Sequence, residues 1–493
     1  MRQVLILLFL VPTFIFGQDC NCVSNFGWLK TTFEENDAGF QYIIDSKGEE
    51  AYEVHSQMVR SKLKTALTPG ECSILLNEWL SFFRKGHIGL SYIGQSANEP
   101  TSNEPKADED KKEQRMEVWE SYSIGTKKFK EYLNQKTTQD FEGIYGSGPY
   151  KIGIKREENV FIGFIIESGN EVWSRGEIKL KIFDQDGKVS SVYYMGDRSA
   201  VESEDVLLLG TNNLQVGNIY FTRTYPEIKD DSPYRLHFKM LNSQLPFLEQ
   251  LNESTLYFRI PSFTGTPEKL AIDSVIAANR EKLLTTENLI IDIRNGTGGS
   301  DFGYKGIIPF FYTNPIRTPG VKFRSTILNN QRMLDFSNSE GLAIEYNLQF
   351  TEEEKKGFKR DYEKLSKHIG EFVNVDSATV SITKHDSIYP FPKKVGIIHN
   401  QRNASTDEQF LLAAKQSKKV KLFGRTTAGA LDVSNLNVVK SPCEDYRLFY
   451  TLTKSLRIPH MSIDDKGIQP DYFIDNEIPE YEWINYVSKI LNE

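Results

Sequence analysis

KVGIIHNQRNASTDEQFLLAAKQSKKVKLFGRTTAG, at residues 394–429, is the stretch that decides the fold of this chain. Its apolar segment from Val395 to His399 predicts a buried strand, and a polar turn then leads into a helix that opens at Ser405. A second apolar segment, Leu289 to Arg294, ends in the glycine-rich loop NGTGGS at residues 295–300. Together with the helical patterns between them, these two strands indicate an α/β core.

Ser405 allows two interpretations. Residues 405–408, Ser-Thr-Asp-Glu, form a capping-box pattern in which the serine oxygen accepts from the third amide and Glu408 reaches back. Such boxes are common, so the local sequence alone favours a helix cap. A hydroxyl at the positive end of a helix can instead act as a nucleophile. The loop at 295–300 is also compatible with a phosphate loop, although no Gly-Lys-[Ser/Thr] follows it.

The longer pattern around Ser405 resembles that of the C-terminal-processing, or tail-specific, serine peptidases. In that family the nucleophilic serine stands three residues before a Glu. Its helix is followed by a short strand ending in Gly and by a threonine-glycine turn. Glu408, the strand Val420 to Phe423 with Gly424, and Thr427-Ala428-Gly429 follow in that order here. The resemblance implies a ClpP/crotonase-like peptidase core with Ser405 as its nucleophile.

Hydrolysis of an amide requires a base and oxyanion donors as well as the nucleophile. The resemblance assigns the oxyanion to the backbone amides of Thr406 and of Gly298 or Gly299, where glycine lets a carbonyl approach the main chain. The serine–lysine members of the family place their lysine in the turn that carries Ala430 here, so that lysine is missing. The protein is therefore either inactive or uses another base.

His87 is the candidate base. Residues 83–90, FRKGHIGL, resemble the Gly-His-Thr-like element of the tricorn-type members, in which a histidine from the N-terminal helical part reaches the serine. Imidazole, with a pKa of about 6.5, can accept the serine proton at neutral pH. The alternatives are a histidine without a catalytic role, and a different base, Lys440 or Lys454.

Asp464 is the third candidate catalytic residue. The tricorn-type members carry a carboxylate shortly before a Gly-x-x-Pro-Asp element, and residues 463–471 read IDDKGIQPD. The resemblance implies that Asp464, where the family has Glu, orients or polarises the catalytic pair. The two neighbouring acids, Asp464 and Asp465, are equally compatible with a solvated turn.

The spacing of apolar residues predicts an α+β multidomain fold. A helical N-terminal segment, with one helix starting at Thr68-Pro69, precedes a small antiparallel β domain with strands near 150, 160, 177, 189 and 217. The α/β region that follows has a predicted helix at 302–311 and a charged helical insertion at 330–390. The predicted boundaries are a signal peptide at 1–17, a helical domain at 18–140 with a flexible loop at 95–114, a β domain at 141–250 and a peptidase domain at 251–493.

Composition restricts the class of protein. The chain has 493 residues, 39% of them hydrophobic and 26% charged, as in soluble proteins of two or three domains. Its net charge of −8 argues against nucleic acid as a partner. Residues 1–17 are typical of a signal peptide and too short for a membrane span. Export permits disulfides; Cys20 or Cys22 bonded to Cys72 is one possibility, and free thiols, Cys443 included, are the other.

The sequence therefore predicts an exported serine endopeptidase, periplasmic or extracellular, that acts on polypeptides. No metal or organic cofactor is expected, and no stable membrane insertion after the signal peptide is removed. Two alternatives remain. One is a catalytically inactive protein of the same fold that binds peptides or acts as a scaffold, and the other is an esterase that uses the same serine.

Overall fold

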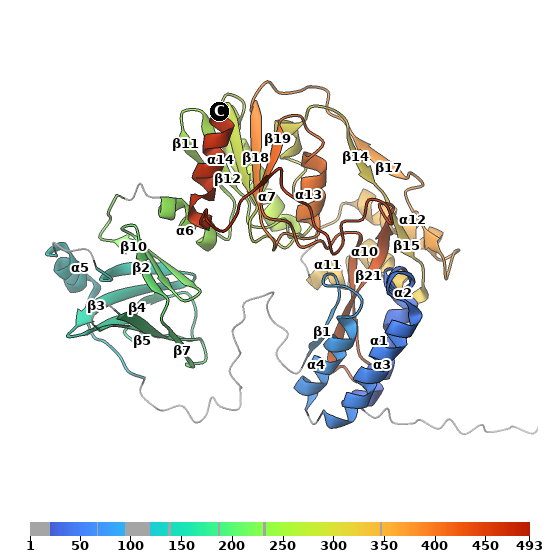
Figure 1. Ribbon diagram of the computed structural model, residues 1–493, viewed down its shortest axis with the longest axis horizontal. Helices are drawn as coiled ribbons and strands as arrows, with labels where there is room; N and C mark the ends of the chain where they lie inside the picture. Colours follow the sequence, from blue (N-terminus) through green and yellow to red (C-terminus); the bar gives the residue numbers. More distant parts are fainter. Residues whose placement is uncertain are drawn as a thin grey trace, which may run out of the picture.

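The computed structural model describes residues 20–66, 68–93, 119–136, 140–185, 188–229, 233–345 and 348–493. The predicted signal peptide and the predicted loop at 95–114 lie outside these residues. Figure 1 shows a group of N-terminal helices, a β domain set apart from them, and a C-terminal region built on further sheets. This arrangement confirms the predicted α+β multidomain fold. Among the described residues, no helix is both long and apolar enough to cross a bilayer.

The N-terminal region consists of α-helices packed around aromatic side chains. Trp79 lies edge-on to Phe26 and Phe33, with ring centroids 5.7 and 5.8 Å apart. The predicted helix start at Thr68-Pro69 is confirmed, because Thr68 and Glu71 form a capping box. The helices are α1 (Cys22–Asn36), α2 (Phe40–Lys47), α3 (Glu49–Lys62) and α4 (Pro69–Leu80), with a 3-10 turn at Leu63–Thr65.

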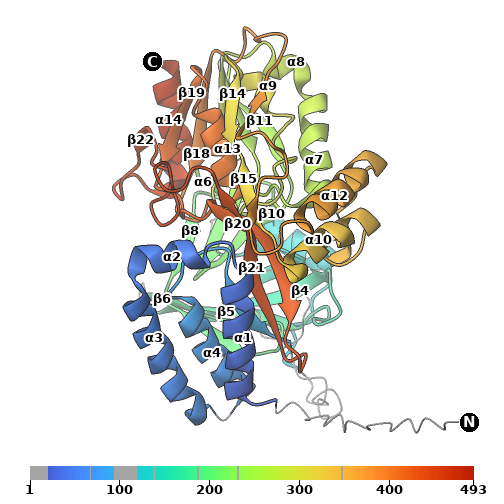
Figure 2. The ribbon, with the colours of Figure 1, turned by 90° about the vertical axis from the view of Figure 1, so that its right-hand side faces the viewer.

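These helices pack on the C-terminal part of the chain. After α4, the short strand β1 (Gly89–Tyr92) pairs antiparallel with β21 (Tyr446–Ser455). Buried Leu448 and Tyr450 of β21 belong to the same apolar core as the helices. Figure 2 shows the helices beside the long hairpin that β21 forms with β20 (Val433–Lys440). The turn between α4 and β1, which contains His87, is thereby held against the C-terminal region.

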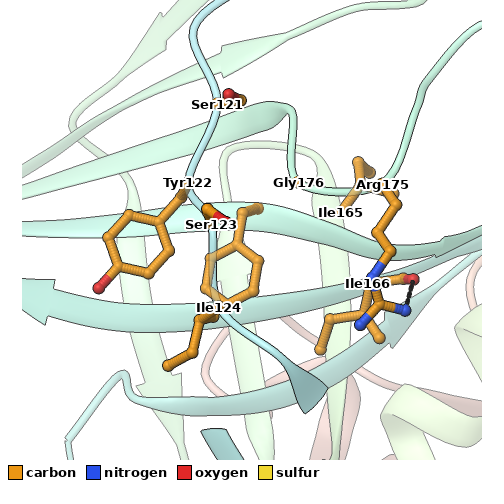
Figure 3. A pocket seen from close by; sticks show the side chains of 9 residues that line it. Ser121, Tyr122, Ser123, Ile124, Ile165, Ile166, Arg175 and Gly176 are labelled. Atoms are coloured by element: carbon orange, nitrogen blue, oxygen red, sulfur yellow. Dashed lines mark hydrogen bonds between the residues drawn. The ribbon is translucent and has the colours of Figure 1, made fainter. Parts of the chain in front are cut away.

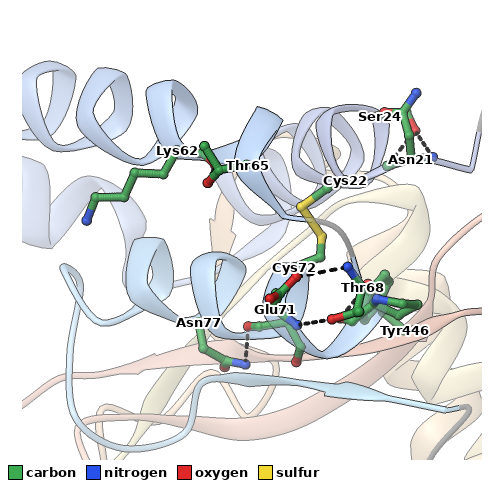
Figure 4. The surroundings of a disulfide bond; sticks show 12 residues. Asn21, Cys22, Ser24, Lys62, Thr65, Thr68, Glu71, Cys72, Asn77 and Tyr446 are labelled. Carbon is green, nitrogen blue, oxygen red and sulfur yellow. Dashed lines mark hydrogen bonds between the residues drawn. A yellow bond between two sulfur atoms is a disulfide. The ribbon is translucent and has the colours of Figure 1, made fainter.

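Two disulfide bonds join the same parts covalently. Cys22 is bonded to Cys72, which links α1 to α4, and Figure 4 shows this bond near the capping box of α4. It is one of the pairings that the sequence left open, and the alternative of free thiols is wrong. Cys20 is bonded to Cys443, between β20 and β21, a pairing that the sequence did not indicate.

The β domain is a single antiparallel sheet of nine strands in the order β7-β6-β5-β4-β3-β2-β10-β9-β8. Four of its short strands, β2, β7, β8 and β9, were not predicted. The helix α5 (Thr126–Asn134), predicted to lie in the helical domain, packs its Phe129 against Phe164 of this sheet. The strands are β2 (Gly143–Ser147), β3 (Tyr150–Glu157), β4 (Val160–Ser168), β5 (Ile178–Gln185), β6 (Lys188–Tyr194), β7 (Ala200–Ser203), β8 (Val206–Leu209), β9 (Asn213–Val216) and β10 (Ile219–Tyr225).

A shallow pocket lies on this domain, between residues 121–124 and β4 (Figure 3). The amide of Tyr122 donates to the carbonyl of Gly176 at 2.7 Å, which attaches the segment to the sheet. At the other end of the pocket, Arg175 Nη1 donates to the carbonyl of Ile166 at 3.4 Å. The pocket contains none of the candidate catalytic residues.

A six-stranded sheet in the order β11-β12-β13-β18-β19-β22 forms the C-terminal core, and its strands from β12 onward run parallel. Alternate residues along β18 face opposite sides, so Val395 and Ile397 pack with α7 and α13, and Ile398 packs with α14. The predicted boundary at 250 falls inside β11. The elements are β11 (Phe247–Asn252), β12 (Thr255–Arg259), β13 (Asn288–Asp292), β18 (Lys394–His399), β19 (Val420–Gly424), β22 (Tyr472–Phe473), α6 (Pro233–Asn242), α7 (Gly265–Ala278), α8 (Arg280–Leu283), α13 (Thr406–Ala414) and α14 (Trp483–Asn492).

The predicted insertion at 330–390 is helical only in part, because two strand pairs flank its helices. The predicted helix at 302–311 is mostly wrong, because residues 302–307 form turns and only the last four residues are helical. Phe310 and Phe311 of this short helix are buried in the core. The elements are α9 (Ile308–Phe311), β14 (Ile316–Pro319), β15 (Val321–Arg324), α10 (Ile327–Asn338), α11 (Leu342–Glu345), α12 (Glu352–Leu365), β16 (Phe372–Val373) and β17 (Val380–Thr383).

Candidate active site

The two loops quoted from the sequence meet at the carboxyl edge of the parallel sheet. The strands β13 and β18 are neighbours, so the loops that follow them lie side by side. The side chain of Asn403 donates to the carbonyl of Ile293 at 2.6 Å, and the amide of Asn295 donates to Asn400 Oδ1 at 3.1 Å. At Gly298 an added Cβ would lie only 2.7 Å from the Cβ of Ser405. The glycine at 298 is therefore needed for the two loops to pack together.

Ser405 has an unusual backbone conformation, with φ 57° and ψ −121°. A non-glycine residue at such a positive φ costs on the order of 1–3 kcal/mol and is common at functional sites. Ser405 precedes α13, but its side chain makes no capping hydrogen bond. The Glu408 carboxylate accepts from Thr427 Oγ1 and from the amides of Gly429 and Ala430, so most of its hydrogen bonds go to the turn after β19. The helix-cap interpretation of Ser405 is therefore wrong.

The predicted oxyanion donors surround this serine. An added Cβ at Gly298 would come within 3.0 Å of the amide nitrogen of Thr406, and the Thr406 hydroxyl donates to the carbonyl of Gly299 at 2.9 Å. The Gly298 amide interacts with the Asp407 carboxyl, whose pKa burial raises to about 7 and this amide lowers. Among the described residues, the amides of Gly299 and Thr406 have no acceptor. These two amides can therefore donate to an oxyanion without breaking an existing hydrogen bond.

His87 comes close to the Ser405 turn although it lies in the N-terminal region. Its neighbour Gly86 packs on Ala430, where an added Cβ would lie 2.4 Å from the Cβ of Ala430. The carbonyl of Ala430 accepts from the amide of Ser405 at 2.9 Å. One alanine therefore separates the turn that carries the imidazole from the backbone of the serine.

The ring of His87 is oriented by a main-chain carbonyl. His87 Nδ1 lies 2.8 Å from the carbonyl oxygen of Val433, and a carbonyl can only accept. Nδ1 therefore carries the hydrogen, and Nε2 is left with a lone pair. Burial lowers the pKa of His87, which keeps the ring neutral at pH 7. A neutral imidazole with a free Nε2 lone pair can take a proton.

Asp464 binds the segment that carries the Val433 carbonyl, and among the residues that the structure describes its hydrogen bonds do not include Ser405. Its carboxylate accepts from the amides of Leu431, Asp432 and Val433 at 2.6, 2.6 and 3.1 Å. Partial burial raises the pKa of Asp464 to about 6. Asp432 in turn accepts from the amide of Asp464 at 2.9 Å. Asp464 thus fixes the segment whose Val433 carbonyl holds His87, so the solvated-turn interpretation does not hold for Asp464, whereas the neighbouring Asp465 is exposed.

Lys454 lies opposite Val433 in the pairing of β20 with β21, but its side chain is directed to Phe372. Lys454 Nζ is placed 4.5 Å from the ring centroid of Phe372, and burial lowers its pKa. Lys440 lies at the other end of β20, opposite Arg447 in the strand register of β20 and β21. Among the described residues, no hydrogen bond joins either lysine to Ser405. The contact of Gly86 with Ala430 also explains why the turn at 430 carries a small residue rather than lysine.

Sequence reasoning missed several residues at this site. The Val433 carbonyl and the His87 ring are 346 residues apart, and no local pattern indicates that pairing. Asp407 was quoted only as part of the capping box. The buried Arg84, three residues before His87, was not considered, although a charged residue directly after Phe82 and Phe83 is a signal that could have been used.

The fold and the loops at Ser405 define a serine-type peptidase domain. Residues 254–474 match the model of peptidase family S41, which supports the C-terminal-processing peptidases as the family of this part of the chain. The resemblance drawn from the sequence is confirmed.

Solved structures are similar to this chain at low identity. Mature CPAF complexed with lactacystin aligns over 96% of this chain and 97% of its own, with 12% identity and a TM-score of 0.51. The photosystem II D1 C-terminal processing protease aligns over 96% of this chain and 97% of its own, with 11% identity and a TM-score of 0.39. Tricorn protease aligns over 96% of this chain and 36% of its own, with 12% identity and a TM-score of 0.41. No curated protein matches the sequence.

Proposed function

We propose that this protein is an exported serine endopeptidase in which Ser405 is the nucleophile and His87 the general base. One observation carries the proposal. The Gly86-His87 turn rests on Ala430, whose carbonyl binds the Ser405 amide, while Val433 holds His87 Nδ1 and leaves Nε2 unprotonated. These contacts support His87 as the base, because its Nε2 lone pair is free and its turn rests on the residue that binds the Ser405 amide. The two disulfides support export, since such bonds persist in oxidising compartments.

In the proposed reaction, His87 Nε2 takes the proton of Ser405 Oγ as the oxygen attacks the carbonyl carbon of a peptide bond. The carbonyl oxygen becomes an oxyanion, which accepts hydrogen bonds from the amides of Thr406 and Gly299. The imidazolium then gives its proton to the leaving nitrogen, and the C–N bond breaks to leave an acyl-enzyme. Water then gives a proton to His87 Nε2 and attacks the ester carbonyl. The bond to Ser405 breaks, and His87 returns the proton to Ser405 Oγ.

Gly298 and Asp464 have supporting roles in this proposal. The Gly298 amide interacts with Asp407, so the hydrogen bond to the oxyanion is assigned to Gly299 instead. Asp464 acts through the backbone: it holds the amides of 431–433 and so places the carbonyl that orients His87.

A fluorophosphonate probe tests the proposal, because it forms a covalent bond only with an activated serine. We expect labelling of the native protein, and loss of labelling in Ser405→Ala and His87→Ala. Ser243→Ala, which removes an exposed hydroxyl after α6, serves as the matched control and should label normally. An unlabelled native protein would favour the inactive peptide-binding alternative. Labelling with cleavage of small esters but not of an unfolded polypeptide would favour an esterase.

A further inference from the structure

The buried side chain of Arg84 donates hydrogen bonds to the turn that carries His87. Arg84 Nε donates to the carbonyl of Gly86 at 3.1 Å, and its Nη2 donates to the carbonyl of His87 at 3.0 Å. His87 itself has φ 55°, a conformation that is uncommon for residues other than glycine. The guanidinium therefore binds the two carbonyls of the strained turn.

Asp37 fixes the guanidinium in turn. Arg84 Nη1 and Nη2 donate to the two carboxylate oxygens of Asp37 at 2.8 and 2.6 Å, a bidentate pair. The side chains of Arg84 and Asp37 are only 5% and 0% exposed. Asp37 Oδ2 also accepts from the amide and the hydroxyl of Thr451, at 3.0 and 2.9 Å. The pair thus connects the end of α1, the His87 turn and strand β21.

We propose that Arg84, fixed by Asp37, is a positioning residue that holds the His87 imidazole at the Ser405 turn. The inference rests on the proposed function, since it concerns the placement of the proposed base. Arg84 and Asp37 do not touch the reacting atoms. They act through the backbone of residues 86 and 87, whose carbonyls accept from the Arg84 guanidinium.

The charges of the pair provide a signature that a purely structural role lacks. Besides burial, the positive charge of Arg84 lowers the pKa of His87, and the negative charge of Asp37 raises it. Removing either charge should therefore shift the pKa of His87 in a known direction. The shift should be toward higher pH in Arg84→Met and toward lower pH in Asp37→Asn.

The experiment measures kcat and KM of the full-length protein on an unfolded polypeptide, as a function of pH. The acid limb of kcat/KM reports the pKa of the free enzyme's base. Arg84→Lys keeps the charge but not the planar fork, so we expect kcat to fall by about tenfold or more with KM little changed. Arg84→Met and Asp37→Asn should move the acid limb in opposite directions. The matched control is Arg198→Lys, at an arginine that donates to Glu177 in the β domain. It should change neither kcat nor the position of the acid limb.

Thr451→Val provides a milder test if the charge variants do not fold. It removes one hydroxyl that bonds to both Asp37 and Arg84, and we expect a smaller fall in kcat. The inference is overturned if folded variants of Arg84 and Asp37 keep the native kcat and the native acid limb. That outcome is distinct from failure of the proposed function, in which the native protein itself is neither labelled at Ser405 nor active.

Discussion

Gly86 and Ala430 touch so closely that a Cβ on the glycine would lie 2.4 Å from the Cβ of the alanine. This contact is where the N-terminal helical region meets the Ser405 turn. It also occupies the place where the serine–lysine members of the family carry their lysine. A longer side chain at position 430 would therefore compete with Gly86 for this space.

Gly86→Ala should reduce peptidase activity by at least about tenfold, because the new methyl group pushes the His87 turn away from Ala430. Comparison of kcat/KM with the native protein checks this. Ala430→Gly in the same chain makes room for the methyl group and should restore much of the activity. Gly27→Ala, where no atom lies within 4 Å of the added Cβ, should leave activity unchanged. Full activity in Gly86→Ala would contradict the prediction.

Ala430→Lys tests whether the lysine of the serine–lysine members can be reintroduced. We expect a folded protein with little fluorophosphonate labelling, since the longer side chain displaces Gly86 and with it the proposed base. The control is Lys440→Ala, which removes a lysine at the far end of β20 and should not affect labelling. If Ala430→Lys were more active than the native protein, lysine rather than His87 would be the better base for this fold.

Asp407→Asn should stabilise the protein at alkaline pH. Burial raises the pKa of Asp407 to about 7, above the value of about 4 in an unfolded chain. The folded state therefore binds the proton more tightly, and the associated stability is complete below about pH 4 and is lost as pH rises through 7. Asparagine mimics the protonated acid, so the free energy of unfolding at pH 8 should rise by on the order of 1–4 kcal/mol.

The control for Asp407→Asn is the pH dependence of its stabilising effect. Urea unfolding at pH 8 and at pH 4 should show that the advantage of Asp407→Asn disappears at the lower pH. Asp273→Asn, at a more exposed carboxylate paired with Lys269 on α7, should show no such difference. An Asp407→Asn protein equally stable relative to the native chain at both pH values would mean that the buried carboxyl keeps an ordinary pKa.

Replacing both Cys22 and Cys72 by alanine should lower the free energy of unfolding by about 2–4 kcal/mol, because the bond closes a loop of 50 residues. Denaturation under oxidising conditions measures the loss. Adding a reductant to the native protein should reproduce at least this effect, since it also opens the bond between Cys20 and Cys443. A native protein whose unfolding curve is unaffected by reduction would argue against these bonds.

Much of the core could be predicted because it depends on local rules. The strands β13 and β18 are short apolar runs ended by glycine or asparagine, and α4 begins at a capping box, so propensity and burial agree there. The short strands of the β domain were missed because runs of four residues carry too little alternation to be recognised.

The candidate site could be predicted only in part. The amino-acid sequence by itself determined the strand–turn–helix corner at Ser405, its glycine-rich partner loop and the absence of a lysine at position 430. The tertiary structure decided that the Ser405 side chain does not cap α13. Ser405 has a positive φ where it packs against Gly298 and donates its amide hydrogen to the Ala430 carbonyl, while Thr427, Gly429 and Ala430 donate to the Glu408 carboxylate. The tertiary structure also decided where His87 lies, because its hydrogen bond to Val433 joins residues 346 apart. Such a contact depends on how whole elements pack, which no local pattern encodes.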